Sequence, residues 1–134
     1  MKRFGPDDHD GLKMLQRELP DWEIDFISAD QNGWAITERR IQHDMGYRLH
    51  LIPEEDRAPA FARLWPNAAQ DVIFIGDGMF DAPLLQSCFY GIAPRDAAPI
   101  ARAMAVYVTQ SLGGNRAVAK ACLHIIQTAK EDGW

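Results

Sequence analysis

The stretch from Asp71 to Asp81, Asp-Val-Ile-Phe-Ile-Gly-Asp-Gly-Met-Phe-Asp, constrains the fold of this chain more than any other. Residues 72–75 are an apolar run with β-branched and aromatic members, which predicts a strand buried on both faces in a helix-covered parallel sheet. The Gly-Asp-Gly that follows predicts a sharp turn, because glycine adopts backbone conformations that other residues avoid. Ligands bind at this carboxyl edge of open α/β sheets, so Asp77 and Asp81 are expected at the mouth of a crevice.

These two carboxylates fit a magnesium site that handles phosphate. Mg²⁺ takes one or two protein carboxylates together with phosphate oxygens and water. Asp77 is predicted to be a metal ligand, since no helix that it could cap begins directly after it. Asp81 has two interpretations. It is either a direct metal ligand, or an outer-shell group or the N-cap of a helix that begins at Ala82 with Pro83 in its first turn.

Strand and helix patterns alternate along the rest of the chain. Strands are expected at about 24–28, 47–51, 72–75, 89–93 and 105–108, and helices at about 8–19, 33–44, 57–64, 82–86, 97–104 and from 117 onwards. Asp56 and Asp96 are predicted N-caps, and residues 1–7 and 130–134 are predicted to be irregular. The alternation predicts one α/β domain over residues 1–134, a Rossmann-like three-layer sandwich with a mostly parallel sheet and helices on both faces.

Composition argues against several functional classes. The net charge of -5 and the pI near 5.2, with no basic stripe, argue against nucleic acid or an acidic membrane as a partner. The sequence has no apolar run of transmembrane length and no signal-peptide pattern, so a cytoplasmic location is expected. Cys88 and Cys122 have no paired-cysteine spacing and are predicted to be free thiols. The four histidines are too scattered for a zinc site, and no Gly-x-Gly-x-x-Gly follows a strand.

The order and spacing of the motifs resemble the C-terminal half of haloacid dehalogenase (HAD) superfamily phosphatases. The motifs are Gly76-Asp77-x-x-x-Asp81, Asp96-Ala97, Tyr107-Val108-Thr109, Gly113-Gly114 and Ala117-Val118, with Phe4 and residues 8–15 similar to the segment before the first helix. The chain is most similar to the small capless branch. That branch includes 3-deoxy-manno-octulosonate 8-phosphate (KDO 8-phosphate) phosphatase and the C-terminal domain of animal-type cytidylyl sialic acid synthetases.

The resemblance implies roles for four residues. Asp77 would hold Mg²⁺ and Asp81 would support it. Ser28 stands where the family has a serine or threonine that hydrogen-bonds the transferring phosphoryl group, and Arg57 stands where it usually has a charge-stabilising lysine. Arginine and lysine are not equivalent there, and Asp30 adds an unfavourable negative charge near a phosphate pocket. The alternatives are a turn serine for Ser28 and an exposed first helical residue for Arg57.

The resemblance also implies an aspartate nucleophile and a second aspartate two residues later, both after an apolar central strand. Residues 1–7 contain no buried run, so Asp8-His9-Asp10-Gly11, which copies this signature, is interpreted as a helix start with Asp8 as N-cap. The chain therefore resembles an N-terminally truncated HAD-like fold that lacks the nucleophile strand. Without its central strand, the sheet is expected either to close up or to take a strand from a partner.

Two functions follow from the resemblance. The first is Mg²⁺-dependent hydrolysis of a sugar-acid phosphate monoester, as in KDO 8-phosphate phosphatases, impaired in this chain because the nucleophile motif is missing. Its partner would be a small phosphorylated sugar acid. The alternative is a non-catalytic HAD-like domain that serves oligomerisation or regulation, as in the C-terminal domain of sialic acid cytidylyltransferases. A homo-oligomer is compatible with both.

Overall fold

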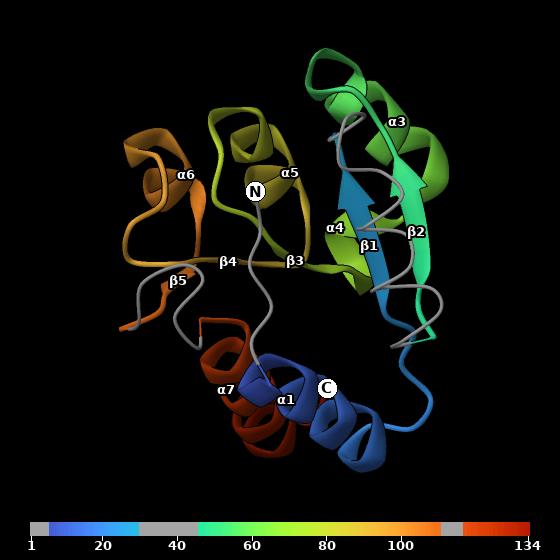
Figure 1. Ribbon diagram of the computed structural model, residues 1–134, viewed down its shortest axis with the longest axis vertical. Helices are drawn as coiled ribbons and strands as arrows, with labels where there is room; N and C mark the ends of the chain where they lie inside the picture. The colour runs from blue at the N-terminus through green and yellow to red at the C-terminus, as the bar shows by residue number, and fades with distance from the viewer. Residues whose placement is uncertain (1–5, 30–45, 111–116) are drawn as a thin grey trace.

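A computed structural model describes residues 6–29, 46–110 and 117–134 of the chain (Figure 1). The predicted helix at 33–44 and the motif residues Phe4, Asp30 and Gly113-Gly114 lie outside the described residues. The α-helices are α1 (Pro6–Glu18), α3 (Arg57–Leu64), α4 (Ala68–Asp71), α5 (Ala82–Ser87), α6 (Pro99–Met104) and α7 (Ala117–Asp132), and the 3-10 helices are η2 (Glu54–Asp56) and η3 (Met79–Asp81). The strands are β1 (Asp25–Ser28), β2 (Arg48–Leu51), β3 (Ile73–Ile75), β4 (Tyr90–Ala93) and β5 (Tyr107–Val108).

The predicted α/β architecture is confirmed. Every strand pairing is parallel, as expected when helices connect successive strands. Helices α1 and α7 pack together on one side of the strands, while α3, α5 and α6 lie on the other side (Figure 1). The molecule therefore has the three layers of a Rossmann-like sandwich.

The strands form two sheets rather than one. Strand β1 pairs with β2, and β3, β4 and β5 form a second sheet in that order. Within the part of the chain that the structure describes, β1 and β3 do not pair with each other. Closure of the sheet, the first of the two outcomes expected for a missing central strand, is therefore wrong.

Strand β3 is less buried than its sequence predicts. All three of its residues are half-buried, whereas Ile92 and Ala93 of the neighbouring β4 are completely buried. An apolar run predicts that a strand has cover on both faces, but not which strands flank it. The side of β3 away from β4 borders a cavity, so the prediction of a strand buried on both faces is wrong.

The main core lies between the helix pair α1 and α7 and the strands. Leu12 and Leu15, from the apolar stripe predicted for α1, pack with Cys122 and Ile125 of α7 and with Ile92. Neither cysteine forms a disulfide, as predicted; Cys122 is buried and Cys88 is half-buried, and burial raises the pKa of the Cys88 thiol. Across the described ranges, no helix has the length and apolar character needed to cross a bilayer.

The helix caps predicted at Asp8 and Asp96 are wrong. Helix α1 begins at Pro6, so Asp8 lies inside its first turn instead of at the N-cap. Helix α6 begins at Pro99 and has no side-chain cap from Asp96. Proline explains both shifts, because its fixed φ suits the first helical positions and its missing N–H needs no cap there.

The C-terminal tail, residues 130–134, is more ordered than predicted. Helix α7 includes most of it, and the backbone N–H of Trp134 donates to the carbonyl of Ala129 (3.0 Å). The Trp134 ring packs against the rings of Trp22 and Tyr90. An isolated tryptophan after a helix shows no periodicity, so the sequence pattern could not predict this anchor.

His124 of α7 is expected to make the stability of the fold depend on pH. Its ring stacks on Tyr107 with centroids 3.6 Å apart, and its Nε2 lies 2.8 Å from the Tyr90 hydroxyl. Burial lowers the pKa of His124, so the folded state binds the proton more weakly than the unfolded chain does. The free energy of unfolding should therefore fall as the pH drops below about 6.5, the pKa of histidine in the unfolded chain. The fall should end once the pH is below the lowered pKa of His124 in the folded state.

Urea denaturation at a series of pH values between neutral and mildly acidic measures this effect. The variant His124→Gln keeps a polar side chain that does not titrate, so its stability should change less with pH over this window. Equal pH dependence in the variant and the wild-type protein would show that His124 does not carry the effect.

Candidate functional site

The turn after β3 is built around a glycine. A Cβ on Gly76 would lie 2.6 Å from the Phe74 ring and 2.8 Å from Cγ of Asp81, which is too close for any other residue. The absence of a side chain lets Asp81 fold back over the end of the strand. The chain turns at the carboxyl edge of the sheet, as predicted, but neither Gly76 nor Gly78 has a positive φ, so glycine is needed at position 76 for close packing and not for an unusual backbone conformation.

Asp81 is the buried anchor of this turn. Its side chain is 3% exposed, and its Oδ2 accepts hydrogen bonds from the backbone N–H groups of Asp77 and Gly78, both at 3.0 Å. Helix α5 receives no side-chain cap, so the prediction that Asp81 caps the helix at Ala82 is wrong. The carboxylate binds the preceding turn because the backbone N–H groups there point back toward it. A metal-supporting role for Asp81 stays a prediction.

Arg57 is brought to the same turn. It is the first residue of α3, whose bounds match the prediction, although Asp56 makes no side-chain cap. The Arg57 side chain is only 12% exposed, and its Nη1 donates to Oδ1 of Asp81 at 2.6 Å. The alternative interpretation of Arg57 as an exposed residue is therefore wrong.

One donor of Arg57 has no acceptor. Its Nε is buried and makes no hydrogen bond to any residue that the structure describes. A buried donor without a partner is costly, and such groups in proteins usually bind a ligand, an ion or water. The Nε–H of Arg57 is therefore a buried donor whose acceptor the described residues do not supply.

Asp77 lies at the rim, with its side chain exposed and its residue lining a large cavity. Its carbonyl accepts a hydrogen bond from the N–H of Ala98 at 2.9 Å, which ties the turn after β3 to the loop after β4. The carboxylate is thus held at the edge of a parallel sheet, where the sequence analysis placed it. Its role as a metal ligand stays a prediction.

Ser28 ends β1, as predicted. Its carbonyl accepts a hydrogen bond from the N–H of Ile52 at 2.9 Å, which fixes the end of the strand. Of the two last residues of β1, Ile27 is the one that lines the cavity. The phosphate-binding role of Ser28 stays a prediction, as does the alternative of a turn serine.

The described residues fit only part of a magnesium site. They contain no group of three or more histidine, cysteine, aspartate or glutamate side chains that could hold a metal. Both oxygens of Asp81 already accept hydrogen bonds from protein donors, which leaves this carboxylate fewer lone pairs for a cation than that of Asp77. Mg²⁺ would need its remaining oxygen ligands from elsewhere, such as phosphate and water.

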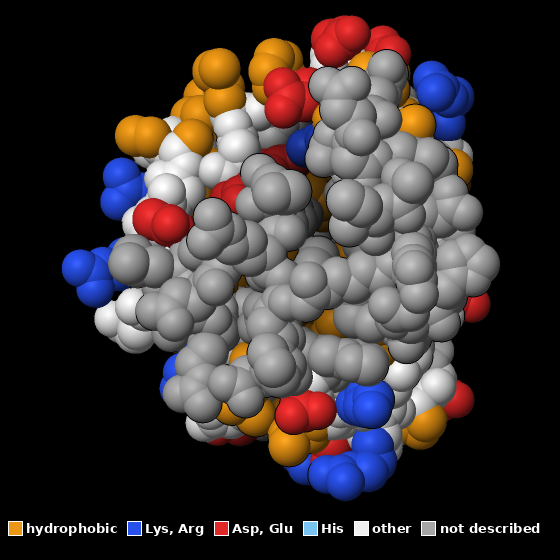
Figure 2. Space-filling view, in the orientation of Figure 1, with side chains coloured by type: hydrophobic (Ala, Val, Ile, Leu, Met, Phe, Trp, Pro, Cys, Tyr) orange, Lys and Arg blue, Asp and Glu red, His pale blue; other side chains and the backbone are white. Residues whose placement is uncertain are grey.

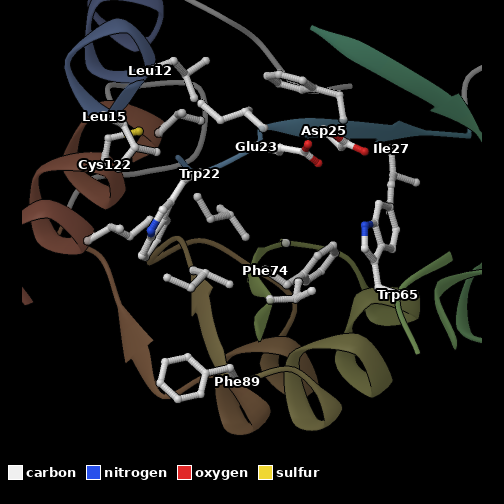
Figure 3. Close-up of a pocket in the computed structure, with 18 of the residues that line it drawn as sticks. Leu12, Leu15, Trp22, Glu23, Asp25, Ile27, Trp65, Phe74, Phe89 and Cys122 are labelled. Carbon is white, nitrogen blue, oxygen red and sulfur yellow. The ribbon is translucent and has the colours of Figure 1, made fainter. Parts of the chain in front are cut away.

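A cavity of about 1130 Å³ opens between the two sheets. Figure 3 shows Asp25 and Ile27 of β1 on one side of it and Phe74 of β3 on the other, with Trp22 and Trp65 toward its two ends. Side chains of α1 and α7 form a further wall (Figure 3). The sequence could not predict this cavity, because it depends on how far apart two strands distant in sequence are held.

A polar cluster on β1 and β2 was also missed. Oδ2 of Asp25 lies 3.0 Å from Nε2 of His50, and Oδ1 accepts a hydrogen bond from Nε of Arg48 at 3.1 Å. The signal for this cluster is the register, which places Asp25 opposite Arg48. The cluster fixes the orientation of the Asp25 side chain where it faces the cavity (Figure 3).

The surface around the site is mainly acidic. In the space-filling view, several acidic side chains lie in the upper left part of the face, and a basic side chain lies among them (Figure 2). Asp77 and Asp96 are both exposed and both line the cavity. A phosphate ligand would therefore need a cation or Arg57 to offset this negative charge.

The sequence and structure were compared with known proteins. Residues 60–122 match the family model of haloacid dehalogenase-like hydrolases. No curated protein sequence matches the chain at a significant level.

Several solved structures have a similar fold. A 3-deoxy-D-manno-octulosonate 8-phosphate phosphatase from Yersinia pestis is 26% identical, with a TM-score of 0.80 over 98% of this chain and 69% of its own. The Moraxella catarrhalis enzyme, solved with magnesium, phosphate and KDO, is 24% identical, with a TM-score of 0.79. The match covers 98% of this chain and 74% of the enzyme. The cobalt-bound Haemophilus influenzae phosphatase is 23% identical, with a TM-score of 0.76. The match covers 97% of this chain and 75% of that phosphatase. The family match over residues 60–122 and the similar solved structures show that this chain has a haloacid dehalogenase-like fold and is similar to the KDO 8-phosphate phosphatase branch.

Proposed function

We propose that this domain carries the phosphate-binding and metal-binding part of a haloacid dehalogenase-like phosphatase that acts on a sugar-acid phosphate monoester. The observation that supports it most is the buried Nε–H of Arg57, which has no partner among the described residues and is tied through Asp81 to the turn that carries the exposed residue Asp77. Guanidinium donors are suited to phosphate oxygens, and a carboxylate at the same edge suits a Mg²⁺ ion that shares them. The similarity to KDO 8-phosphate phosphatases supports the choice of substrate class.

In this proposal each residue of the turn has a separate task. Asp81 holds Arg57 and the backbone of the turn in place, so that neither has to reorganise when a phosphate arrives. Arg57 donates from Nε to a phosphate oxygen, and Asp77 provides one ligand of the cation that would neutralise the phosphate. Ser28 is proposed as a second donor from the end of β1.

The described residues offer no nucleophile for the reaction. The Asp-x-Asp-Gly imitation at Asp8 to Gly11 lies within helix α1, not at the carboxyl end of a strand. Asp25 faces the cavity but is bound to Arg48 and His50. We therefore propose that this polypeptide alone has very low phosphatase activity, and that the attacking carboxylate has to come from a segment outside the described residues.

Hydrolysis of para-nitrophenyl phosphate by the purified chain in the presence of Mg²⁺ tests this proposal. We expect a rate close to that of a boiled-protein control. The same assay with added EDTA controls for a metal-dependent contaminant. Robust turnover that depends on Mg²⁺ would contradict the proposed impairment.

A second function is supported by one specific observation. Arg57 already has a carboxylate partner in Asp81, so the net charge of the pair is neutral and its attraction for phosphate is reduced. A non-catalytic domain that serves oligomerisation or regulation fits this arrangement. Binding of inorganic phosphate distinguishes the two, because the non-catalytic alternative predicts none at this site. A cytoplasmic location and a homo-oligomer belong to both proposals.

A further inference from the structure

We propose that one end of the cavity is a binding site for an organic cation, a quaternary ammonium group that carries an apolar chain. The site lies where the strands begin, beside Asp71 before β3, whereas Asp77 follows β3 at the other end of the cavity. Its ligand has the opposite charge to phosphate. The inference rests on the residues at this end and does not depend on the proposed phosphatase activity.

The first argument is the charge of the cavity lining. Six carboxylate residues line the cavity, and no lysine, arginine or histidine of the described ranges does so. A cleft that is lined by one sign of charge and has low-dielectric walls concentrates ions of the opposite sign. The cavity therefore favours a cation over an anion. The six residues are Asp21, Glu23, Asp25, Asp71, Asp77 and Asp96.

The second argument is that two of these carboxylates have no cationic partner among the residues that the structure describes. Arg48 binds both Glu23 and Asp25, so the charge of those two is partly offset. Asp21 and Asp71 are exposed, and the side chain of neither makes an ion pair or hydrogen bond to a described residue. Their negative charge is therefore available to a ligand at this end.

The third argument is an aromatic wall beside these carboxylates. The rings of Trp22, Phe89 and Trp134 all line the cavity, and Figure 3 shows the first two. Trp134 is nearly parallel to Trp22, with ring centroids 6.5 Å apart, and it meets Phe89 edge to face at 5.3 Å. The face of an aromatic ring attracts a cation, and the face of tryptophan does so most strongly. Three segments far apart in the sequence thus bring together rings that suit a quaternary ammonium group.

The carboxylates and the rings belong to the same site. Asp21 directly precedes Trp22 in the chain. The backbone N–H of Phe89 donates to the carbonyl of Val72 at 2.9 Å, which places Phe89 next to Asp71. Carboxylates therefore flank the aromatic wall on two sides. A quaternary ammonium group donates no hydrogen bonds, so ring faces can contact its methyl groups while the carboxylates balance its charge.

The site is largely formed before a ligand arrives. Trp134 is held by a backbone hydrogen bond to the end of α7 and by the ring of Tyr90, at 5.0 Å between centroids. Leu15 and Ile125 line the cavity and belong to the core cluster against which Trp22 packs. The volume of about 1130 Å³ leaves room for an apolar chain along this wall.

Isothermal titration calorimetry with three ligands that share a hexyl chain tests the proposal. They are hexyltrimethylammonium, the neutral 1-hexanol and the anionic hexyl sulfate. Each is added to the full chain at low ionic strength, where charges are least screened. We expect saturable binding of hexyltrimethylammonium and at least about tenfold weaker binding of the other two ligands.

A pair of double variants tests the two carboxylates. Replacing Asp21 and Asp71 with asparagine should weaken the binding of hexyltrimethylammonium by about fivefold or more, because it removes the charge at this end of the cavity. Both side chains are exposed, so the fold should be unaffected. Replacing Glu54 and Glu55 with glutamine is the matched control. These residues of η2 are also exposed but do not line the cavity, so binding should not change.

The variant Trp22→Leu tests the aromatic wall. It keeps an apolar side chain but removes the ring face, so hexyltrimethylammonium should bind about tenfold more weakly while the affinity for 1-hexanol changes little. Circular dichroism of this variant shows whether it is folded. The double variant of Asp21 and Asp71 decides the question if it is not.

Three results would overturn the proposal. Absence of saturable binding of hexyltrimethylammonium would mean that the site does not exist. Equal binding of this ligand and 1-hexanol would mean adsorption to apolar surface, without a role for charge. Equal weakening by the two double variants would mean that the net charge of the chain attracts the cation, and not this site. Because the ligand carries no phosphate and the assay contains no Mg²⁺, failure of the phosphatase proposal would leave the outcome unchanged.

Discussion

Replacement of Asp81 with alanine is expected to lower the free energy of unfolding by about 3–5 kcal/mol. Asp81 is buried and accepts hydrogen bonds from Arg57 and from the backbone N–H groups of Asp77 and Gly78. Its removal leaves the guanidinium of Arg57, which is 12% exposed, without its carboxylate partner. A buried charge that loses its partner costs much more than the intact pair contributes.

Asp77→Ala is the matched control for this prediction. Asp77 belongs to the same turn, but its side chain is exposed and accepts none of the hydrogen bonds that the structure shows for the turn. Its removal should change the free energy of unfolding by less than about 0.5 kcal/mol. Urea denaturation of the two variants measures both effects. Equal losses of stability would contradict the anchoring role assigned to Asp81.

Ile92→Ala is expected to cost about 2–5 kcal/mol, and Ile75→Ala less than half as much. The two residues are direct neighbours in the register of β3 and β4. Ile92 is completely buried in the main core, so its truncation leaves a new cavity among close-packed side chains. Ile75 is half-buried and already borders a cavity, so less contact is lost when its side chain is shortened.

This pair of substitutions tests the two-sheet arrangement by chemical denaturation. The two side chains are identical in type and lie on adjacent strands, so the difference in cost reports the surroundings alone. Similar costs for Ile75→Ala and Ile92→Ala would mean that β3 is covered as completely as β4. The cavity between β1 and β3 would then not be open in solution.

Much of the fold could be predicted from local pattern. The leucine spacing of α1, the bounds of α3 and the strand before Gly76 all depend on residues close together in sequence. The position of Asp77 at the carboxyl edge could also be predicted, because a strand followed by Gly-Asp-Gly places the aspartate there in any open α/β sheet. The order of the motifs was enough to indicate the superfamily.

The rest depended on contacts between distant segments. Whether the Asp81 side chain turns forward to the helix or back to the turn is decided by Arg57, which lies 24 positions earlier. The burial of β3 is decided by its distance from β1, and no periodicity within β3 carries that information. Caps at Asp8 and Asp96 were predicted from residue type, but the prolines at the starts of α1 and α6 set those boundaries.

We propose that the Nε–H of Arg57, which has no partner among the described residues, receives a phosphate oxygen near the turn that carries Asp77. The Nε–H resonance of a buried arginine can be followed in a proton–nitrogen correlation spectrum, and its absence in the variant Arg57→Lys assigns it. Titration with inorganic phosphate and Mg²⁺ should shift this resonance together with the backbone signals of Asp77 and Gly78. An Arg57 Nε–H signal that stays unmoved through the titration would contradict the account.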